Sequence, residues 1–186
     1  MCSAVAPPFF SAAKVRQAFE NARAAGLATM VVSPEPEALG LIEKFVREFD
    51  QKLAIHNHGP EDKRYPSPYD AWNLIQPLDA RISLCIDVGH TARAGVDPAE
   101  TIRKCASRLY DIHLKDSVAL PGVMKDIPVE VGAGRLDIRG ILTALRAINY
   151  GGVVAFEYEK VAGNPVVGRA ESIGYVRGML SALARS

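Results

Sequence analysis

The stretch ISLCIDVGH, Ile82–His90, decides the fold of this chain. Its apolar part is short, rich in β-branched residues and closed by an acid, which is typical of a strand buried in a parallel sheet. An Asp97-Pro98 pair follows and is typical of the start of a helix. A strand with polar groups at its carboxyl end, followed by a helix, predicts an α/β fold with a functional site at the strand ends.

The same alternation continues along the whole chain. Strands are predicted at residues 28–33, 52–56, 82–87, 109–114 and 153–158. Helices are predicted at residues 12–25, 35–49, 68–78, 99–107, 137–148 and 169–184, the first capped by Ser11 and stopped by Gly26. Residues 117–134 are expected to form a long loop with a short strand at 128–131. This order implies a parallel sheet with right-handed crossovers.

The composition limits the class of protein. Of the 186 residues, 48% are hydrophobic and 23% are charged, and the formal net charge is +1. This balance predicts one globular domain over residues 1–186. Because no block of like charge is present, we expect no nucleic-acid or membrane partner, and a small molecule or another protein as the ligand.

The N-terminus and the cysteines indicate in which cellular compartment the protein is expected. The first ten residues, MCSAVAPPFF, lack the basic start and the continuous apolar stretch of a secretory signal. Cys2, Cys85 and Cys105 are widely spaced and form no C-x-x-C pair, which predicts reduced thiols. We therefore expect a cytoplasmic protein. Cys85, inside an apolar run, is expected to be a small core residue.

Polar residues gather where the predicted strands end. All four histidines lie at or just beyond such an end, together with several acids and a lysine: His56, His58, His90, His113, Asp87, Lys115, Asp116, Glu157 and Glu159. Imidazoles and carboxylates together suit a divalent ion such as manganese, iron, cobalt or zinc, whereas an all-oxygen set favours magnesium. A cation would also relieve the crowding of these charges. The sequence therefore predicts a metal site.

Five segments follow one another in a recognisable order: IHNHGPEDKRYPSP, LCIDVGHTARAG, LYDIHLKD, VGAGRLDIRGIL and GGVVAFEYE. Their order and spacing resemble those of the sugar phosphate isomerase/epimerase family, the xylose isomerase-like TIM barrels. That barrel has eight strands, so the resemblance implies an incomplete barrel of about five βα units that lacks the first three. Such a chain is a fragment, a truncated reading frame, or a protomer whose open sheet edges are covered by a partner, for example in a homo-oligomer.

The resemblance also implies the ligands of a single divalent ion. In the family a glutamate, an aspartate, a histidine and a second glutamate hold it, and the last three correspond to Asp87, His113 and Glu157. The position of the first glutamate is His56 in this chain, and His58 has the same strand parity and competes with it for the role. His90 corresponds to the family's substrate-contacting histidine.

The resemblance implies a metal-dependent isomerase or epimerase of a sugar or keto-sugar. The family's two glutamates work as a pair, so the histidine at position 56 leaves Glu157 as the carboxylate base. His56 can shuttle a proton, while His90 and Lys115 position hydroxyls or stabilise developing charge. A keto-sugar lyase or dehydratase needs only one base and one acid and stays open as an alternative. A non-catalytic sugar-binding subunit also stays open.

Charged residues near the predicted ligands are candidates for contacts with the carbohydrate. Arg93 and Lys115 closely follow proposed ligands, and we expect them to meet a substrate oxygen or carboxylate. Glu61 and His58, on the loop after the second strand, are further candidates. Arg135, after VGAG, is suited to the same role. Lys63 and Arg64 are equally well explained as solvated charge.

Overall fold

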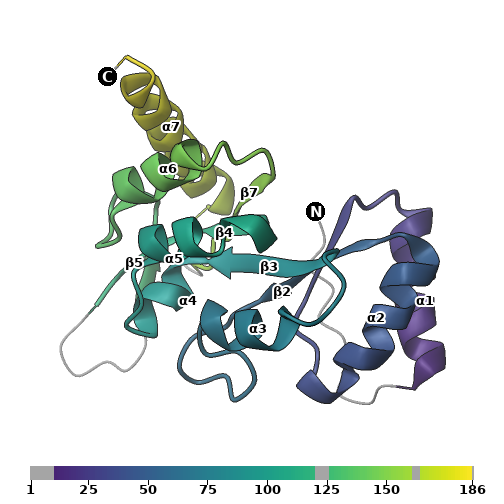
Figure 1. Cartoon of the computed structure of the whole chain (residues 1–186). Helices are drawn as coiled ribbons and strands as arrows, with labels where there is room; N and C mark the ends of the chain where they lie inside the picture. Colours follow the sequence, from purple (N-terminus) through teal and green to yellow (C-terminus); the bar gives the residue numbers. More distant parts are fainter. Residues whose placement is uncertain (1–10, 120–125, 161–163, 186) are drawn as a thin grey trace.

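The computed structural model describes residues 11–119, 126–160 and 164–185. Within them, five parallel strands form one sheet in the order β1 (Thr29–Val32), β2 (Lys52–His56), β3 (Ile82–Asp87), β4 (Leu109–Leu114) and β7 (Val153–Phe156). The sheet is curled but open, with β1 and β7 at its edges (Figure 1). This half-barrel confirms the predicted incomplete TIM-barrel fold.

Helices connect successive strands and pack on the sheet. They are α1 (Ala12–Ala24), the 3₁₀ turn η1 (Pro36–Ala38), α2 (Leu39–Phe49), α3 (Pro68–Ile75), α4 (Val88–Arg93), α5 (Pro98–Lys104), the 3₁₀ turn η2 (Ala106–Arg108), α6 (Ile138–Ala147) and α7 (Pro165–Leu183). Figure 1 shows α1 and α2 together at one end of the molecule and α6 and α7 at the other.

Local signals set the helix starts. The Ser11 side chain accepts a hydrogen bond from the Lys14 amide at 3.3 Å and caps α1, and Asp97 caps α5 in the same way. Ser67 and Asp70 form a capping box at α3, with Pro68 in the first turn. The predicted starts of α1 and α3 are therefore confirmed, and α5 begins at Pro98, one residue before its predicted start.

The central strands are covered on both faces. All six residues of β3 are buried, because β2 and β4 flank this strand and α3 packs against it. The apolar face predicted for α2 supplies Leu39, Ile42, Phe45 and Val46 to the core. Phe19 of α1 packs against that helix, with its ring centroid 5.9 Å from that of Phe45. Burial of such side chains stabilises the fold by about 1.5–3 kcal/mol each.

Two helices differ from the prediction at their first turn. The helix predicted from residue 35 begins as a 3₁₀ turn at Pro36–Ala38, where no side chain caps the amides. The last helix was predicted from residue 169 but begins at Pro165, because the Asn164 side chain accepts a hydrogen bond from the Val166 amide at 2.9 Å and proline occupies the first turn.

The region after β4 and the end of β7 also differ from the prediction. The expected short strand at residues 128–131 is present as β6 (Ile127–Val129), but it pairs antiparallel with β5 (Asp116–Val118), which was not expected. Strand β7 ends at Phe156, not at residue 158, so Glu157 lies just beyond it. Hydrogen bonding continues one step further, since the Glu157 amide donates to the Leu114 carbonyl at 3.0 Å.

Cys85 and Cys105 are buried free thiols, as expected, while Cys2 and the first ten residues lie outside the described residues. None of the helices in the described part of the chain combines the length and apolar character needed to cross a bilayer.

Candidate metal centre

Four side chains from four neighbouring strands meet at the carboxyl end of the sheet. His56 ends β2, Asp87 ends β3, His113 lies near the end of β4 and Glu157 follows β7. Asp87 and His113 are partners in the β3–β4 register. One ligand atom from each of the four residues lies within 4.8 Å of the others. The structure thus brings together the four residues that the sequence predicts as metal ligands.

The contacts in this group centre on Glu157. Its Oε2 lies 3.0 Å from Nδ1 of His113 and 3.5 Å from Nε2 of His56. Nε2 of His56 lies 3.6 Å from Oδ2 of Asp87, and within the described residues this buried nitrogen has no hydrogen bond, while Oδ2 is paired with the Lys115 ammonium at 3.0 Å. Buried polar atoms without hydrogen bonds cost free energy. Two imidazoles and two carboxylates at this spacing suit a divalent ion.

The backbone around Asp87 explains its orientation. Its Oδ1 accepts a hydrogen bond from the His90 amide at 2.7 Å and caps α4, a helix that the sequence did not predict. Its amide donates to Oδ1 of Asn57 at 3.0 Å, which joins the ends of β2 and β3. One carboxylate oxygen of Asp87 thus caps the helix while the other, Oδ2, faces His56.

Lys115 places a positive charge against the carboxylates of this group. Its Nζ lies 3.0 Å from Oδ2 of Asp87, 3.1 Å from Oε2 of Glu157 and 2.9 Å from Oε2 of Glu159. Burial alone would lower the pKa of Lys115, but the three carboxylates raise it above its ordinary value. Gly89 leaves room for this side chain, since a Cβ there would lie 2.6 Å from Cγ of Lys115.

Burial and the carboxylates give the histidines opposite pKa shifts. Burial would lower the pKa of His56, but the carboxylates of Asp87 and Glu157 raise it to about 9. Burial lowers the pKa of His58 to about 4, and it also lowers that of His90. Burial would raise the pKa of Glu157, but the His113 and His56 imidazoles beside its carboxylate hold that pKa far below its ordinary range. Without a metal, these pKa shifts therefore favour a protonated His56 beside an ionised Glu157.

A cleft of about 750 Å³ opens beside this group. His58, His90, Arg93, Glu61 and Glu159 are among the residues that line it. Its volume lies in the range typical of small-molecule sites. Nη1 of Arg93 lies 3.1 Å from Nδ1 of His90, and Nη2 of Arg93 pairs with Glu61. Lys115 reaches from the ligand group towards the cleft, with its Nζ 3.3 Å from Nε2 of His90.

Asp116, which the sequence pattern groups with the site, serves the backbone. Its buried carboxylate accepts hydrogen bonds from four amides at 2.9–3.1 Å: those of Ser117, Gly132, Gly134 and Leu136. A Cβ at Gly134 would overlap the Asp116 carboxylate, which explains the second glycine in VGAG. Arg135 pairs with Asp126, 2.6 Å away. Asp116 is therefore a structural residue that holds the loop after β6.

The sequence pattern did not indicate three of the residues that line the cleft, Ser33, Glu35 and Asp62. Of these, Asp62 lies nearest to a predicted site residue, with its Oδ2 3.2 Å from Nδ1 of His58. In the sequence, Asp62 is marked only by its position four residues after His58 in a charged loop. Such a spacing is common in surface loops.

The model of the xylose isomerase-like TIM barrel family matches residues 10–179 of this sequence. This chain belongs to that family. No curated protein is significantly similar to it in sequence.

Solved structures of the same fold include several sugar epimerases. A D-tagatose 3-epimerase-like protein superposes with a TM-score of 0.78 at 18% identity, over 93% of this chain and 70% of that one. The 3-keto-D-glucoside 4-epimerase of E. coli gives 0.74 at 17%, over 90% and 70%. An IolI protein with a bound zinc atom gives 0.78 at 16%, over 91% and 69%. At these identities the likeness establishes the fold.

Proposed function

We propose that this chain is a metal-dependent isomerase or epimerase of a sugar or keto-sugar that acts by removing a proton next to a carbonyl. The observation that carries the proposal is the convergence of His56, Asp87, His113 and Glu157 beside a cleft of about 750 Å³. Family membership and the epimerases among the solved structures of this fold support it.

The four converging residues would hold one divalent ion, which supplies Lewis-acid polarisation of a substrate carbonyl and is manganese, cobalt, zinc, iron or magnesium. Glu157 is the base in this proposal. Its side chain is 31% exposed, whereas that of Asp87 is fully buried. The low pKa of Glu157 keeps it ionised at neutral pH.

The neighbouring side chains complete the proposed site. Lys115 and His90 lie 3.3 Å apart and offer donors to a substrate oxygen on which charge develops. Arg93, paired with Glu61, and His58, which lies beside Asp62, would orient hydroxyl groups from the cleft wall. His56 is suited to ligation or to returning a proton, because its pKa is about 9 without a metal.

A lyase or dehydratase acting on a keto-sugar is the second candidate. The observation that favours it is that Glu157 is the accessible one of the two carboxylates in the ligand set. Epimerisation by two carboxylates needs a second exposed acid, whereas elimination needs one base and one proton donor.

Solvent exchange tests the proposal. The manganese-loaded chain should incorporate deuterium from D₂O into one member of a panel of ketoses and 3-keto-sugars, free and phosphorylated, and should release an isomer of unchanged mass apart from deuterium. Glu157→Gln should lose this exchange, whereas Glu48→Gln, at an exposed pair with Arg16, should keep it. Loss of water from the product would favour the lyase. Metal binding without exchange into any member would overturn the proposal in favour of a sugar-binding subunit.

A further inference from the structure

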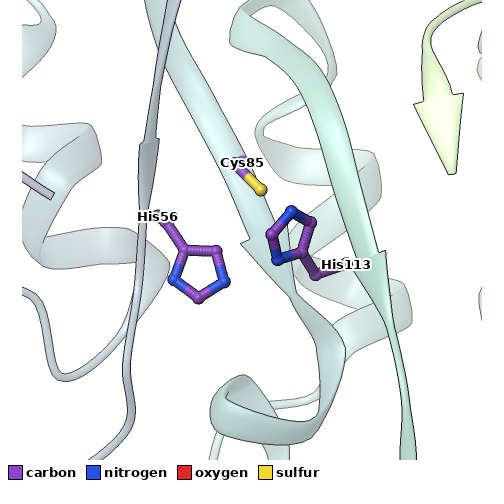
Figure 2. A group of neighbouring side chains, drawn as sticks. All are labelled: His56, Cys85 and His113. Atoms are coloured by element: carbon purple, nitrogen blue, oxygen red, sulfur yellow. The ribbon is translucent and has the colours of Figure 1, made fainter. Parts of the chain in front are cut away.

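Cys85 lies between two of the proposed ligands. It projects from β3 towards His56 of β2 and His113 of β4, as Figure 2 shows. One ligand atom from each of these three residues lies within 4.8 Å of the other two. Cys85 is the register partner of His56 and precedes Asp87 by two residues on the same strand. The sulfur therefore lies one side-chain layer deeper in the sheet than the carboxylate of Asp87.

This deeper group is closed to solvent and contains an unpaired donor. Cys85 is 1% exposed, and His56 and His113 are 5% and 6% exposed. Within the described residues, Nε2 of His56 makes no hydrogen bond, although it lies 3.5 Å from Oε2 of Glu157 and 3.6 Å from Oδ2 of Asp87, so both positions share this imidazole. A buried imidazole nitrogen without a partner, close to a thiol and a second imidazole, is a common arrangement of metal ligands.

We propose that His56, Cys85 and His113 form a second metal position that takes a thiophilic divalent ion, zinc or cadmium. Two nitrogens and one sulfur form a donor set that zinc uses with a fourth ligand left open. On binding, the metal–sulfur bond replaces the S–H bond, and the thiol proton passes to solvent. Manganese and magnesium prefer oxygen ligands and would stay with Asp87 and Glu157.

The two positions exclude each other, because both use the imidazoles of His56 and His113. An ion bound to Cys85 leaves Asp87 and Glu157 paired with Lys115 and lies further from the cleft. Zinc and cobalt, which the first position can also hold, are drawn to the deeper position by the thiolate, whereas manganese and magnesium stay at the first position. This inference concerns binding alone and does not depend on the proposed turnover.

Cobalt provides the first test, because a thiolate ligand adds an intense near-ultraviolet charge-transfer band to Co²⁺ spectra. The full chain titrated with Co²⁺ should show this band. Cys85→Ala should lose it, whereas Cys105→Ala should keep it, because Cys105 is the other buried free thiol. Asp87→Asn should also keep the band, since it removes a ligand of the other position only. A band that survives Cys85→Ala would overturn the inference.

X-ray absorption of the unmodified zinc-loaded chain provides a test that needs no variant. A sulfur scatterer at about 2.3 Å from zinc is expected beside nitrogen scatterers at about 2.0–2.1 Å. A shell of nitrogen and oxygen alone would overturn the inference even if Cys85→Ala fails to fold. The two proposals can fail separately. A sulfur shell in the zinc-loaded chain without deuterium exchange into any sugar would refute the proposed function only. Deuterium exchange without a sulfur shell would refute this second metal position only.

Discussion

The ammonium of Lys115 lies 3.0 Å from Oδ2 of Asp87. The same nitrogen lies 3.1 Å from Oε2 of Glu157, so the lysine supplies the positive charge that two clustered carboxylates need when no metal is bound. A divalent ion bound to the same oxygens must displace this contact. Lys115 therefore competes with the metal, and in the proposed function it is also a donor to the substrate.

Replacing Lys115 separates these two roles. Lys115→Met removes a cation that repels a divalent ion, so Mn²⁺ should bind roughly tenfold more tightly, which corresponds to about 1.4 kcal/mol. Turnover of any substrate found should nevertheless fall by at least about 100-fold, in line with the loss of one stabilising donor. Calorimetric titration measures the first effect, with Lys44→Met on the exposed side of α2 as the control. Weaker manganese binding by Lys115→Met would refute the competition.

Gly89 is predicted to be required for the position of Lys115. A Cβ at residue 89 would lie 2.6 Å from Cγ of that lysine, so Gly89→Ala should push the ammonium out of the site and lower turnover as Lys115→Met does. Gly40→Ala is the matched control, because a Cβ there meets nothing within 4 Å and lies within α2. Kinetics that are equal for Gly89→Ala and wild type would contradict the assignment.

The stability of the metal-free chain should depend on the two neighbouring imidazoles. The pKa of His58 is about 4 in the folded chain against 6.5 ordinarily, so its contribution is present above pH 6.5 and is lost as the pH falls towards 4. His56 has a raised pKa of about 9, so its contribution is present below pH 6.5 and is lost as the pH rises to about 9. Urea unfolding with a chelator should give maximal stability near pH 6.5.

Two single-residue variants test which histidine causes each limb of the profile of unfolding free energy against pH. His58→Gln should flatten the acid limb and His56→Gln the alkaline limb. An acid limb that is unchanged in His58→Gln would show that another group causes it.

Asp116 is predicted to matter for stability more than for chemistry. Asp116→Ala leaves the four amides it serves without their acceptor and should lower the free energy of unfolding by about 3 kcal/mol. Asp137→Ala removes a single exposed cap bond at α6, to the Gly140 amide, and should cost only about 1 kcal/mol. Urea denaturation compares the two, and equal losses would contradict the structural role of Asp116.

The central part of the fold was predictable from the sequence because its signals are local. β2, β3 and β4 begin and end where the apolar runs do. The convergence of His56, Asp87 and His113 followed from the rule that parallel strands end at one edge. Helix α4 was missed because it has six residues and depends on one carboxylate, that of Asp87.

The remaining features depend on where side chains point after folding. Nothing in HLKD distinguishes an acid that faces the site from one that turns back to backbone amides, as Asp116 does. Cys85 fits the apolar pattern of β3, so the sequence predicts a core residue. Only the folded structure places the imidazoles of the two neighbouring strands beside it. The lysine contact with Asp87 was also invisible, since it requires the space left by Gly89.

The measurement that decides whether these ligands form one site is the metal content of the purified chain after equilibration with Mn²⁺ and removal of free ion. The wild-type chain should retain one manganese per chain, and His113→Ala, which lacks one of the four ligands, should retain none. A wild-type chain without bound manganese, or a His113→Ala chain that retains a full equivalent, would show that His56, Asp87, His113 and Glu157 do not bind a common ion.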